Sequence, residues 1–351
     1  MTRVVGIDPG TLSIDVCGIV DGQLYLDRSW PTAEALSEPA GMVEFLTTSG
    51  PPDLIVGPSG YGLPLRRAAE ATETDLRLAF LAPPGETGGI GGLRVLARAL
   101  AASGLPVVYL PAVIHLDTVP AHRKLNRVDL GTADKLCAAA LGIRDQGERR
   151  RRKPEQVSFI LIELGGAFTA GVAVERGQVV DGIGGTSGPI GWRAAGALDG
   201  EVAFLAGEIT KSALFQGGVT SFLERAPALR SVALEAYIEG ATKAARQLRC
   251  SAPSADEILL SGRNAADAGI RDSMETDLAD IGPVRLLTGF ATIAKQGAQG
   301  SALIADGLAG GANRVLVDRL RIREARGTVL DHLIFVSPAS ARARLGIEAG
   351  G

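Results

Sequence analysis

Residues 7–24 read IDPGTLSIDVCGIVDGQL, and 155 positions further on residues 162–179 read IELGGAFTAGVAVERGQV. In both stretches an apolar run ends in an acid, a glycine turn follows, a second apolar run leaves the turn, and Gly-Gln begins a third. Apolar runs broken at glycine predict β-hairpins. Two such hairpins, each with a phosphate-sized glycine turn beside an acid, predict a chain folded as two similar halves around one anionic ligand.

A chain of 351 residues is too long for one ordinary hydrophobic core, so two domains are expected, at 1–150 and 151–351. Each half has the same order of elements: three strands, a helix, then alternating strands and helices. The expected strands are 3–8, 14–20, 23–29, 53–57 and 107–110 in the first half and 157–163, 168–175, 178–182, 257–261 and 284–288 in the second. The expected helices are 32–46, 129–143, 228–248 and one that starts near residue 293. This order predicts two α/β domains with mixed five-stranded sheets flanked by helices.

The helices that close the two halves also match. Gly131-Thr132-Ala133 and Gly300-Ser301-Ala302 correspond at one offset, which also places Gly142 opposite Gly311. Small residues let two helix backbones approach closely, as a hinge between two lobes requires. The alternative is that these residues are helix caps and alanine-rich filler.

Composition excludes several classes of protein. A hydrophobic content of 46% with 21% charged residues is typical of a folded protein. The net charge of -3 gives no electrostatic reason to expect nucleic acid or an acidic membrane as a partner. The one basic run, residues 149–153, lies between the halves and is interpreted as a solvated linker.

The three histidines and three cysteines form no metal-binding pattern, so a zinc site is not expected. No apolar stretch approaches the roughly 20 residues that cross a bilayer. The first residues enter a strand at once, which leaves no room for a signal peptide. These observations predict a cytoplasmic protein.

The first hairpin carries candidate groups for a metal and for phosphates. Asp8 ends a buried strand, where an unpaired carboxylate would be costly. A Mg²⁺ ion held through water would satisfy it, because Mg²⁺ takes few protein carboxylates. Gly10 lets backbone N–H groups approach phosphate oxygens, and the hydroxyls of Thr11 and Ser13 add donors. The alternative is an ordinary β-turn, which Asp-Pro-Gly suits well.

The second hairpin repeats these groups with changes. Glu163 takes the acidic place, and its side chain is one methylene longer than that of aspartate. Gly165 and Gly166 follow, with Thr169 behind them. Two successive glycines at a strand end weaken the strand, so the close approach of a ligand to the backbone explains them better than packing does.

Three further segments carry candidate groups. Residues 182–191 contain five glycines and predict a loop that wraps a ligand through Gly185 and Thr186, with Arg193 as an anion contact; a flexible surface loop is the alternative. Gly262 and Arg263 end a late strand, where they would line a nucleoside pocket. Asp134 lies near the start of the first closing helix and is the candidate for orienting or deprotonating an acceptor group. Its alternative role is a favourable charge at a helix N-terminus.

These motifs, in this order, resemble the superfamily of actin, Hsp70 chaperones and the sugar and acetate kinases. Its two phosphate motifs are similar to the hairpins at Asp8 and Glu163, and its adenosine motif is similar to residues 259–263. Its two connecting helices are similar to residues 131–142 and 300–311. The resemblance implies two actin-like (ribonuclease H-like) domains with a nucleotide cleft between them, and ATP and Mg²⁺ as cofactors.

Within that superfamily, residues 126–136 (NRVDLGTADKL) resemble most the family DUF1464, whose members are sometimes described as predicted butyrate kinases. The same residues are also similar to type III pantothenate kinases, a likeness that implies Asp134 as the active-site acid. Superfamily kinases are often dimers, so a homodimer is one expectation.

The hypothesis from sequence is therefore an ATP-dependent kinase of a small molecule, with a carboxylate or an alcohol as the acceptor. Asp8 would hold Mg²⁺ and act in catalysis together with Glu163 and Asp134. Two alternatives are an ATPase that switches a partner protein and a nucleotide-binding regulator without turnover. The substitution of glutamate for the second aspartate keeps the last of these open.

Overall fold

A computed structural model describes residues 1–86 and 90–348. The first sheet has six strands, in the order β3 (Gln23–Pro31), β2 (Ser13–Val20), β1 (Arg3–Pro9), β4 (Leu54–Val56), β6 (Val107–Tyr109) and β5 (Arg66–Arg67). The second has five, in the order β11 (Val284–Leu286), β10 (Ile258–Ser261), β7 (Phe159–Leu164), β8 (Thr169–Glu175) and β9 (Gln178–Ile183). Both sheets mix parallel and antiparallel pairs, as predicted. The first gains one two-residue strand, β5, that the sequence pattern does not predict.

Helices surround the sheets. Those of the first half are α1 (Thr32–Ser37), α2 (Pro39–Thr48), α3 (Glu73–Phe80), α4 (Ile90–Ala102), α5 (Ala121–Lys124) and α6 (Ala133–Arg150). Those of the second are α7 (Gly200–Ala206), α8 (Val219–Arg225), α9 (Arg230–Arg249), α10 (Ala268–Asp277), α11 (Gln296–Leu308), α12 (Arg314–Leu320) and α13 (Pro338–Arg344). No helix within the described residues is long and apolar enough to cross a membrane.

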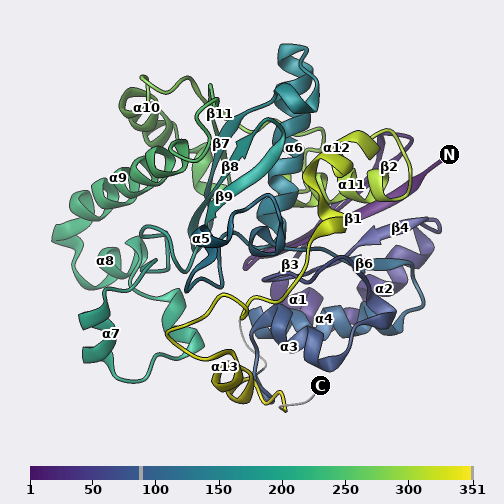
Figure 1. Ribbon diagram of the computed structural model, residues 1–351, viewed down its shortest axis with the longest axis horizontal. Helices are drawn as coiled ribbons and strands as arrows, with labels where there is room; N and C mark the ends of the chain where they lie inside the picture. Colours follow the sequence, from purple (N-terminus) through teal and green to yellow (C-terminus); the bar gives the residue numbers. More distant parts are fainter. Residues whose placement is uncertain (87–89, 349–351) are drawn as a thin grey trace.

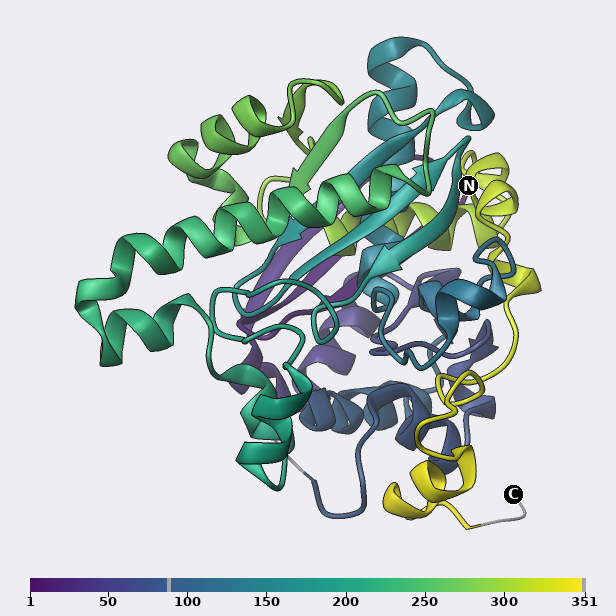
Figure 2. The same ribbon diagram turned by 60° about the vertical axis from the view of Figure 1, so that its left-hand side comes forward.

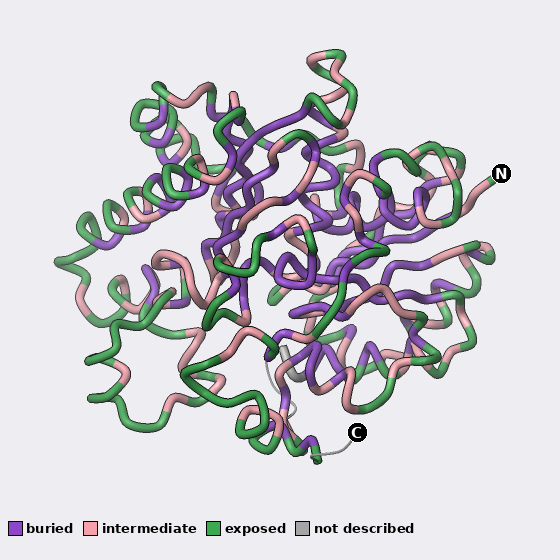
Figure 3. The backbone as a smooth tube through the Cα atoms, in the orientation of Figure 1, coloured by how far each residue is buried: buried purple, intermediate pink, exposed green. Residues whose placement is uncertain are grey.

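The molecule is built in five layers. Helices α1 to α4 cover one face of the first sheet, and α9 and α10 cover the outer face of the second. Helices α6 and α11 fill the space between the two sheets, and their buried residues share one core with both (Figures 1 and 3). Figure 2 shows α9 crossing the outer face of the second sheet and projecting beyond it. The two halves are therefore joined by a continuous apolar centre.

The sequence repeat is confirmed in the backbone of the two hairpins. The amide of Gly10 donates to the carbonyl of Ser13 at 2.9 Å, and the amide of Gly165 donates to the carbonyl of Phe168 at 3.0 Å. Each pair stands at the same position of its repeat. The two turns therefore have the same hydrogen-bonded form although their sequences differ.

The equivalence continues beyond the turns. The strand pairing shifts register after Gly18 in the first hairpin and after Ala173 in the second, again at matching positions. The turns into the third strands have positive φ at Asp21-Gly22 and at Arg176-Gly177. Two successive positive φ angles are typical of the tight turn that suits twisted antiparallel strands.

Each closing helix packs on the sheet of the other half. Helix α6 packs on the second sheet, where a Cβ at Gly142 would lie 2.6 Å from the Phe159 ring. Helix α11 packs on the first, where a Cβ at Gly6 would lie 2.2 Å from the backbone nitrogen of Ala302. The two helices cross at Gly300, where a Cβ would lie within bonding distance of a backbone carbonyl of α6. The close approach expected of the small residues is thus confirmed at Gly300.

The predicted one-to-one match between the two helices is wrong. Gly131 precedes α6 and has a φ of 118°, whereas Gly300 lies in the interior of α11. Gly142 is inside α6, whereas Gly311 follows the end of α11. Gly131 forms a turn before its helix, whereas Gly300 allows two helices to cross. The similar sequences therefore do not mark equivalent positions in the two helices.

The basic run is not a solvated linker. Arg149 and Arg150 end α6 and each lie 2.8 Å from a carboxylate oxygen of Glu257, which is fully buried. Arg152 pairs with Asp256 at 2.8 Å. The run fixes the end of α6 to the start of β10, because a buried carboxylate requires charged partners.

Candidate functional site

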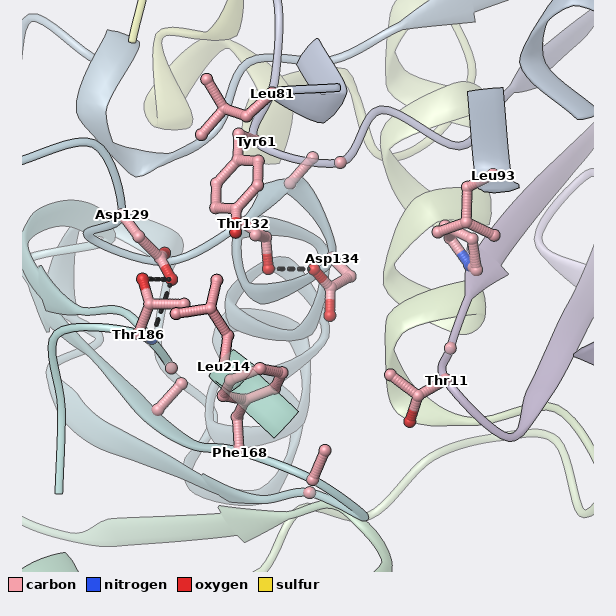
Figure 4. A pocket seen from close by; sticks show the side chains of 18 of the residues that line it. Thr11, Tyr61, Leu81, Leu93, Asp129, Thr132, Asp134, Phe168, Thr186 and Leu214 are labelled. Carbon is pink, nitrogen blue, oxygen red and sulfur yellow. Dashed lines mark hydrogen bonds between the residues drawn. The ribbon is translucent and has the colours of Figure 1, made fainter. Parts of the chain in front are cut away.

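One large cavity of about 1620 Å³ opens between the two sheets. The carboxyl ends of the parallel strands β1, β4, β7 and β10 all reach it, which is where ligands bind in open α/β sheets. Figure 4 shows Tyr61, Thr132 and Asp134 on one side of this space and Thr11 on the other. The volume exceeds the 300–1,000 Å³ or so of a pocket for one drug-sized ligand, so it has room for a nucleotide and a second molecule.

The two repeated hairpins meet in this cavity. A Cβ at Gly166 would lie 3.0 Å from Cδ1 of Leu12, so the turn of the second hairpin touches that of the first. A Cβ at Gly10 would lie 2.6 Å from the ammonium of Lys295. The absence of a side chain at Gly10 and Gly166 thus allows Lys295 and Leu12 to approach the two turns closely.

Asp8 lies at the end of β1 and points at the start of α11. Its carboxyl group is mostly buried, with 7% of the residue exposed. A Cβ at Gly297, in the first turn of α11, would lie 2.6 Å from Oδ2 of Asp8. An acid at this end of a helix is favoured by the helix dipole.

A cluster of Asp134, Lys135 and Glu163 joins the two halves. Lys135, in the first turn of α6, places its ammonium 2.5 Å from Oδ2 of Asp134 and 2.7 Å from Oε1 of Glu163. The hydroxyl of Thr132 donates to the other Asp134 oxygen at 2.5 Å. One lysine of the first half therefore holds the predicted acid of α6 and the acid of the second hairpin together.

These groups shift one another's pKa values. Burial, with the charges of Asp134 and Glu163, raises the pKa of Asp8 to about 7, against the opposing charges of Lys295 and Lys135. Burial alone would raise the pKa of Asp134, but Lys135 holds it below its usual value. Burial would lower the pKa of Lys135, but Asp134 and Glu163 raise it well above its usual value. Burial is thus the main cause of the raised pKa of Asp8, and the two neighbouring carboxylates add to it.

The glycine-rich loop is held in place by a buried acid. Asp129 accepts hydrogen bonds from the amide of Thr186 at 3.3 Å, from its hydroxyl at 3.1 Å and from the amide of Gly131 at 3.0 Å. A Cβ at Gly185 would lie 2.5 Å from Cβ of Phe168. The interpretation of a loose surface loop therefore does not fit, since these contacts fix the loop against the cavity wall (Figure 4).

Replacing Asp129 with asparagine is expected to release this loop. The amide oxygen of asparagine can accept from Thr186 or from Gly131 but not from both, so at least one hydrogen bond to a buried charge is lost. Such bonds contribute roughly 1.5–3 kcal/mol, which predicts amide exchange at Thr186 that is faster by about tenfold or more. Hydrogen exchange read by mass spectrometry measures it.

Asp199→Asn is the matched control for this change. Asp199 caps α7 at an exposed position, and asparagine is an equally good cap. Exchange in the loop should be unchanged in this variant. Equal exchange at Thr186 in the Asp129→Asn variant and the wild type would show that Asp129 does not hold the loop.

The other predicted residues have mixed placements. Ser13, Gly165, Gly262, Arg263 and Arg193 line the cavity, the last two as exposed residues at its rim. Thr169 does not reach it: its side chain is fully buried and its hydroxyl donates to the carbonyl of Ile190 at 3.1 Å.

Several cavity residues escape prediction from sequence. Lys135 has a signal, because it follows Asp134 in the first turn of the helix. Lys295 has none: it precedes α11, and packing alone brings it 2.8 Å from Asp15 on the first hairpin. Tyr61 and Lys211 come from segments without a recognisable motif. Arg66 does not line the cavity and pairs with Asp75 at 2.8 Å, which leaves Arg193 as the arginine predicted to contact the substrate.

The donor groups suit a hydrated magnesium ion better than a fully protein-bound metal. Across residues 1–86 and 90–348, no group of three or more histidines, cysteines and acids has the arrangement to hold a metal ion. Mg²⁺ usually keeps several waters and binds through one or two carboxylates and substrate phosphates. Asp8, a mostly buried carboxylate at the cavity wall, fits that requirement.

Solved structures that share this fold include small-molecule kinases. The structure is similar to a propionate kinase from Francisella tularensis (TM-score 0.58, 13% identity), covering 86% of this chain and 99% of that one. It is also similar to an acetate kinase from Entamoeba histolytica (TM-score 0.57, 10% identity), covering 80% and 87%. At such identities the likeness shows the fold.

The chain belongs to one protein family. The model of the family described as protein of unknown function (DUF1464) matches residues 6–335, which include both hairpins and both closing helices. No curated protein sequence matches the chain significantly.

Proposed function

We propose that the protein is an ATP- and Mg²⁺-dependent phosphotransferase that acts on a small molecule bound in the cavity between its two halves. The observation that carries this proposal is the meeting of the two hairpins around one space, with Lys135 joining Asp134 of the first half to Glu163 of the second. Phosphoryl transfer requires mainly positioning and charge neutralisation, and both are available here.

The residues of the chain divide between these two tasks. The two turns, residues 10–13 and 165–168, would receive phosphate oxygens at backbone amides other than those of Gly10 and Gly165, which donate within the turns, with Thr11 as an additional donor. Lys135 and Lys295 would offset the charge of the phosphates. Asp8 would hold Mg²⁺ through water, and the ion when bound would neutralise charge on the phosphates.

The acceptor would lie next to Asp134, with Glu163 beside it. Gly262 and Arg263 would line the nucleoside pocket at the end of β10. Closure of the two halves about the crossing of α6 and α11 would exclude water and so favour transfer over hydrolysis. A carboxylate and an alcohol are both acceptors that this arrangement admits.

The test is a screen of ATP turnover with Mg²⁺ against small carboxylates, alcohols and vitamin precursors, with Asp8→Ala as the control. We expect at least one compound to raise ADP release above the Asp8→Ala background. If none does, the kinase proposal is refuted. ATP hydrolysis that ignores every small molecule would favour the alternative of an ATPase switch.

Nucleotide binding is tested separately by thermal unfolding with ATP and Mg²⁺. A ligand at about 100 times its dissociation constant adds about 2.7 kcal/mol to stability. The absence of any shift at millimolar ATP would remove nucleotide binding itself from the proposal.

A further inference from the structure

Part of the cavity wall is apolar, and it includes one side chain of the second hairpin. Tyr61, Leu81 and Leu93 come from the first half, and Phe168 and Leu214 come from the second (Figure 4). A ligand rich in hydroxyl groups would leave polar atoms unpaired against this wall, at a cost for each one. The body of the bound molecule is therefore expected to be apolar.

The reacting end of the cavity is acidic. The carboxylates of Asp8, Asp134 and Glu163 all line it, and those of Asp134 and Glu163 lie 2.5 and 2.7 Å from one shared ammonium, that of Lys135. A carboxylate acceptor would bring a further negative charge to this place, whereas a hydroxyl would donate a hydrogen bond to an acid. Each Asp134 oxygen already accepts one bond, from Thr132 or from Lys135, and has a second lone pair free for such a donor.

The cavity also contains a lysine, Lys211, that forms no ion pair with any acid of the described residues. The ammonium of Lys211 lies 5.7 Å from the centre of the Tyr61 ring, and the side chain lines the same cavity. Lys135 and Lys295, the other lysines that line it, each have a carboxylate oxygen within 2.8 Å. In the described part of the chain, Lys211 has no acid within ion-pair distance, and burial lowers its pKa against the opposing charge of Glu86. A partly desolvated ammonium of this kind calls for an anion.

From these three features we propose that the phosphoryl acceptor is a hydroxy acid with an apolar body. Its hydroxyl lies at Asp134, its chain lies between Tyr61, Phe168 and Leu214, and its carboxylate pairs with Lys211. This inference rests on the proposed kinase function. It assigns the hydroxyl as the group that is phosphorylated and the carboxylate as the group that binds Lys211.

The reaction at Asp134 balances without any further reactant. The hydroxyl oxygen forms a bond to the γ-phosphorus of ATP, and the bond from that phosphorus to the β–γ bridging oxygen breaks. ADP leaves with the bonding electron pair, and the hydroxyl proton passes to the Asp134 carboxylate. The product is a phosphate monoester whose carboxylate is unchanged.

The test compares 6-hydroxyhexanoate with 1-hexanol and hexanoate, which have the same carbon chain, together with 4-hydroxybutanoate and 8-hydroxyoctanoate to vary its length. ATP- and Mg²⁺-dependent product formation is followed by phosphorus NMR, which separates a phosphate monoester from an acyl phosphate. At least one hydroxy acid should give the monoester with a kcat/KM at least about tenfold above that of 1-hexanol, since a charged hydrogen bond is at stake.

Lys211→Met keeps the length of the side chain and removes its charge. It is expected to raise KM for the hydroxy acid about tenfold or more, with little change in kcat and none in KM for the alcohol. Lys153→Met, at an exposed position outside the cavity, is the matched control. Arg193→Met tests the competing cation at the rim.

Three outcomes would overturn the inference. Acyl phosphate from hexanoate, without monoester from any hydroxy acid, would keep the kinase function and reject the hydroxy acid. A KM effect from Arg193→Met but not from Lys211→Met would place the carboxylate elsewhere. If ATP binds in the thermal test but none of these compounds is phosphorylated, the acceptor class is wrong, whereas absence of ATP binding refutes the kinase proposal itself.

Discussion

Replacing Lys135 with methionine is expected to destabilise the protein by about 3–5 kcal/mol and to abolish turnover. Methionine fills a similar volume but leaves Asp134 and Glu163 without the ammonium that lies 2.5 and 2.7 Å from them. Two carboxylates from opposite halves would then repel each other and Asp8 across the cavity. Urea unfolding at neutral pH measures the loss of stability.

The matched control is Lys243→Met. Lys243 pairs with Glu239 at 2.8 Å, but both side chains are largely exposed. Exposed pairs contribute about 0–1 kcal/mol, so this variant should unfold almost as the wild type does. Equal losses of stability in the two variants would show that the Lys135 cluster stabilises the protein no more than an exposed ion pair does.

Acid pH should reduce the loss of stability that Lys135→Met causes. The pKa of Asp134 is held below its usual value, so its favourable pairing is complete above that usual value and is lost as the pH falls through the lower, folded-state pKa. The difference in the free energy of unfolding between the wild type and the variant should therefore become smaller below about pH 4. A second change, Glu163→Gln, should restore part of the stability at neutral pH by removing one of the two repelling charges.

The hairpins were predictable because their signal is local. Acid, glycine turn and strand follow one another along the chain, and the repeat marks both copies at once. Helix bounds were also close, as for α9 at Arg230–Arg249 against an expected 228–248. Asp134 and Lys135 are adjacent in sequence and share a helix turn, so their joint position also follows from local pattern.

The rest of the site depends on packing that no local pattern encodes. Lys295 reaches the first hairpin only because α11 lies on the first sheet. Lys211 reaches Tyr61 only because a loop of the second half lies over the cavity. The basic run looked solvated because its partner, Glu257, stands more than a hundred positions away. Thr169 looked like a phosphate donor because repetition shows position in a hairpin but not the side to which a side chain points.

Replacing Asp8 with asparagine is expected to make the ligand-free protein more stable and, at the same time, to reduce turnover by about a hundredfold or more. The Asp8 pKa is raised to about 7 from 3.8, so the folded state binds the proton more tightly than the unfolded state. For an acid shifted in this direction, the penalty is absent below the unfolded value, grows between about pH 4 and 7, and is complete above. Asparagine resembles the protonated acid and carries no such penalty.

The gain in stability should therefore depend on pH in a way that a packing effect would not. We expect about 2–4 kcal/mol at pH 8 and almost none at pH 4, from urea unfolding at both. Asp15→Asn is the matched control on the same hairpin: Asp15 is buried and its carboxylate pairs with Lys295 at 2.8 Å, so this variant should lose stability at pH 8. A loss of stability for Asp8→Asn as well would contradict the raised pKa of Asp8. Asp8→Asn is compared with the wild type in both respects at once: we expect a gain in stability without ligand and a smaller thermal shift with ATP and Mg²⁺. Together these results would mean that the negative charge of Asp8 destabilises the ligand-free protein and is needed to bind its ligands.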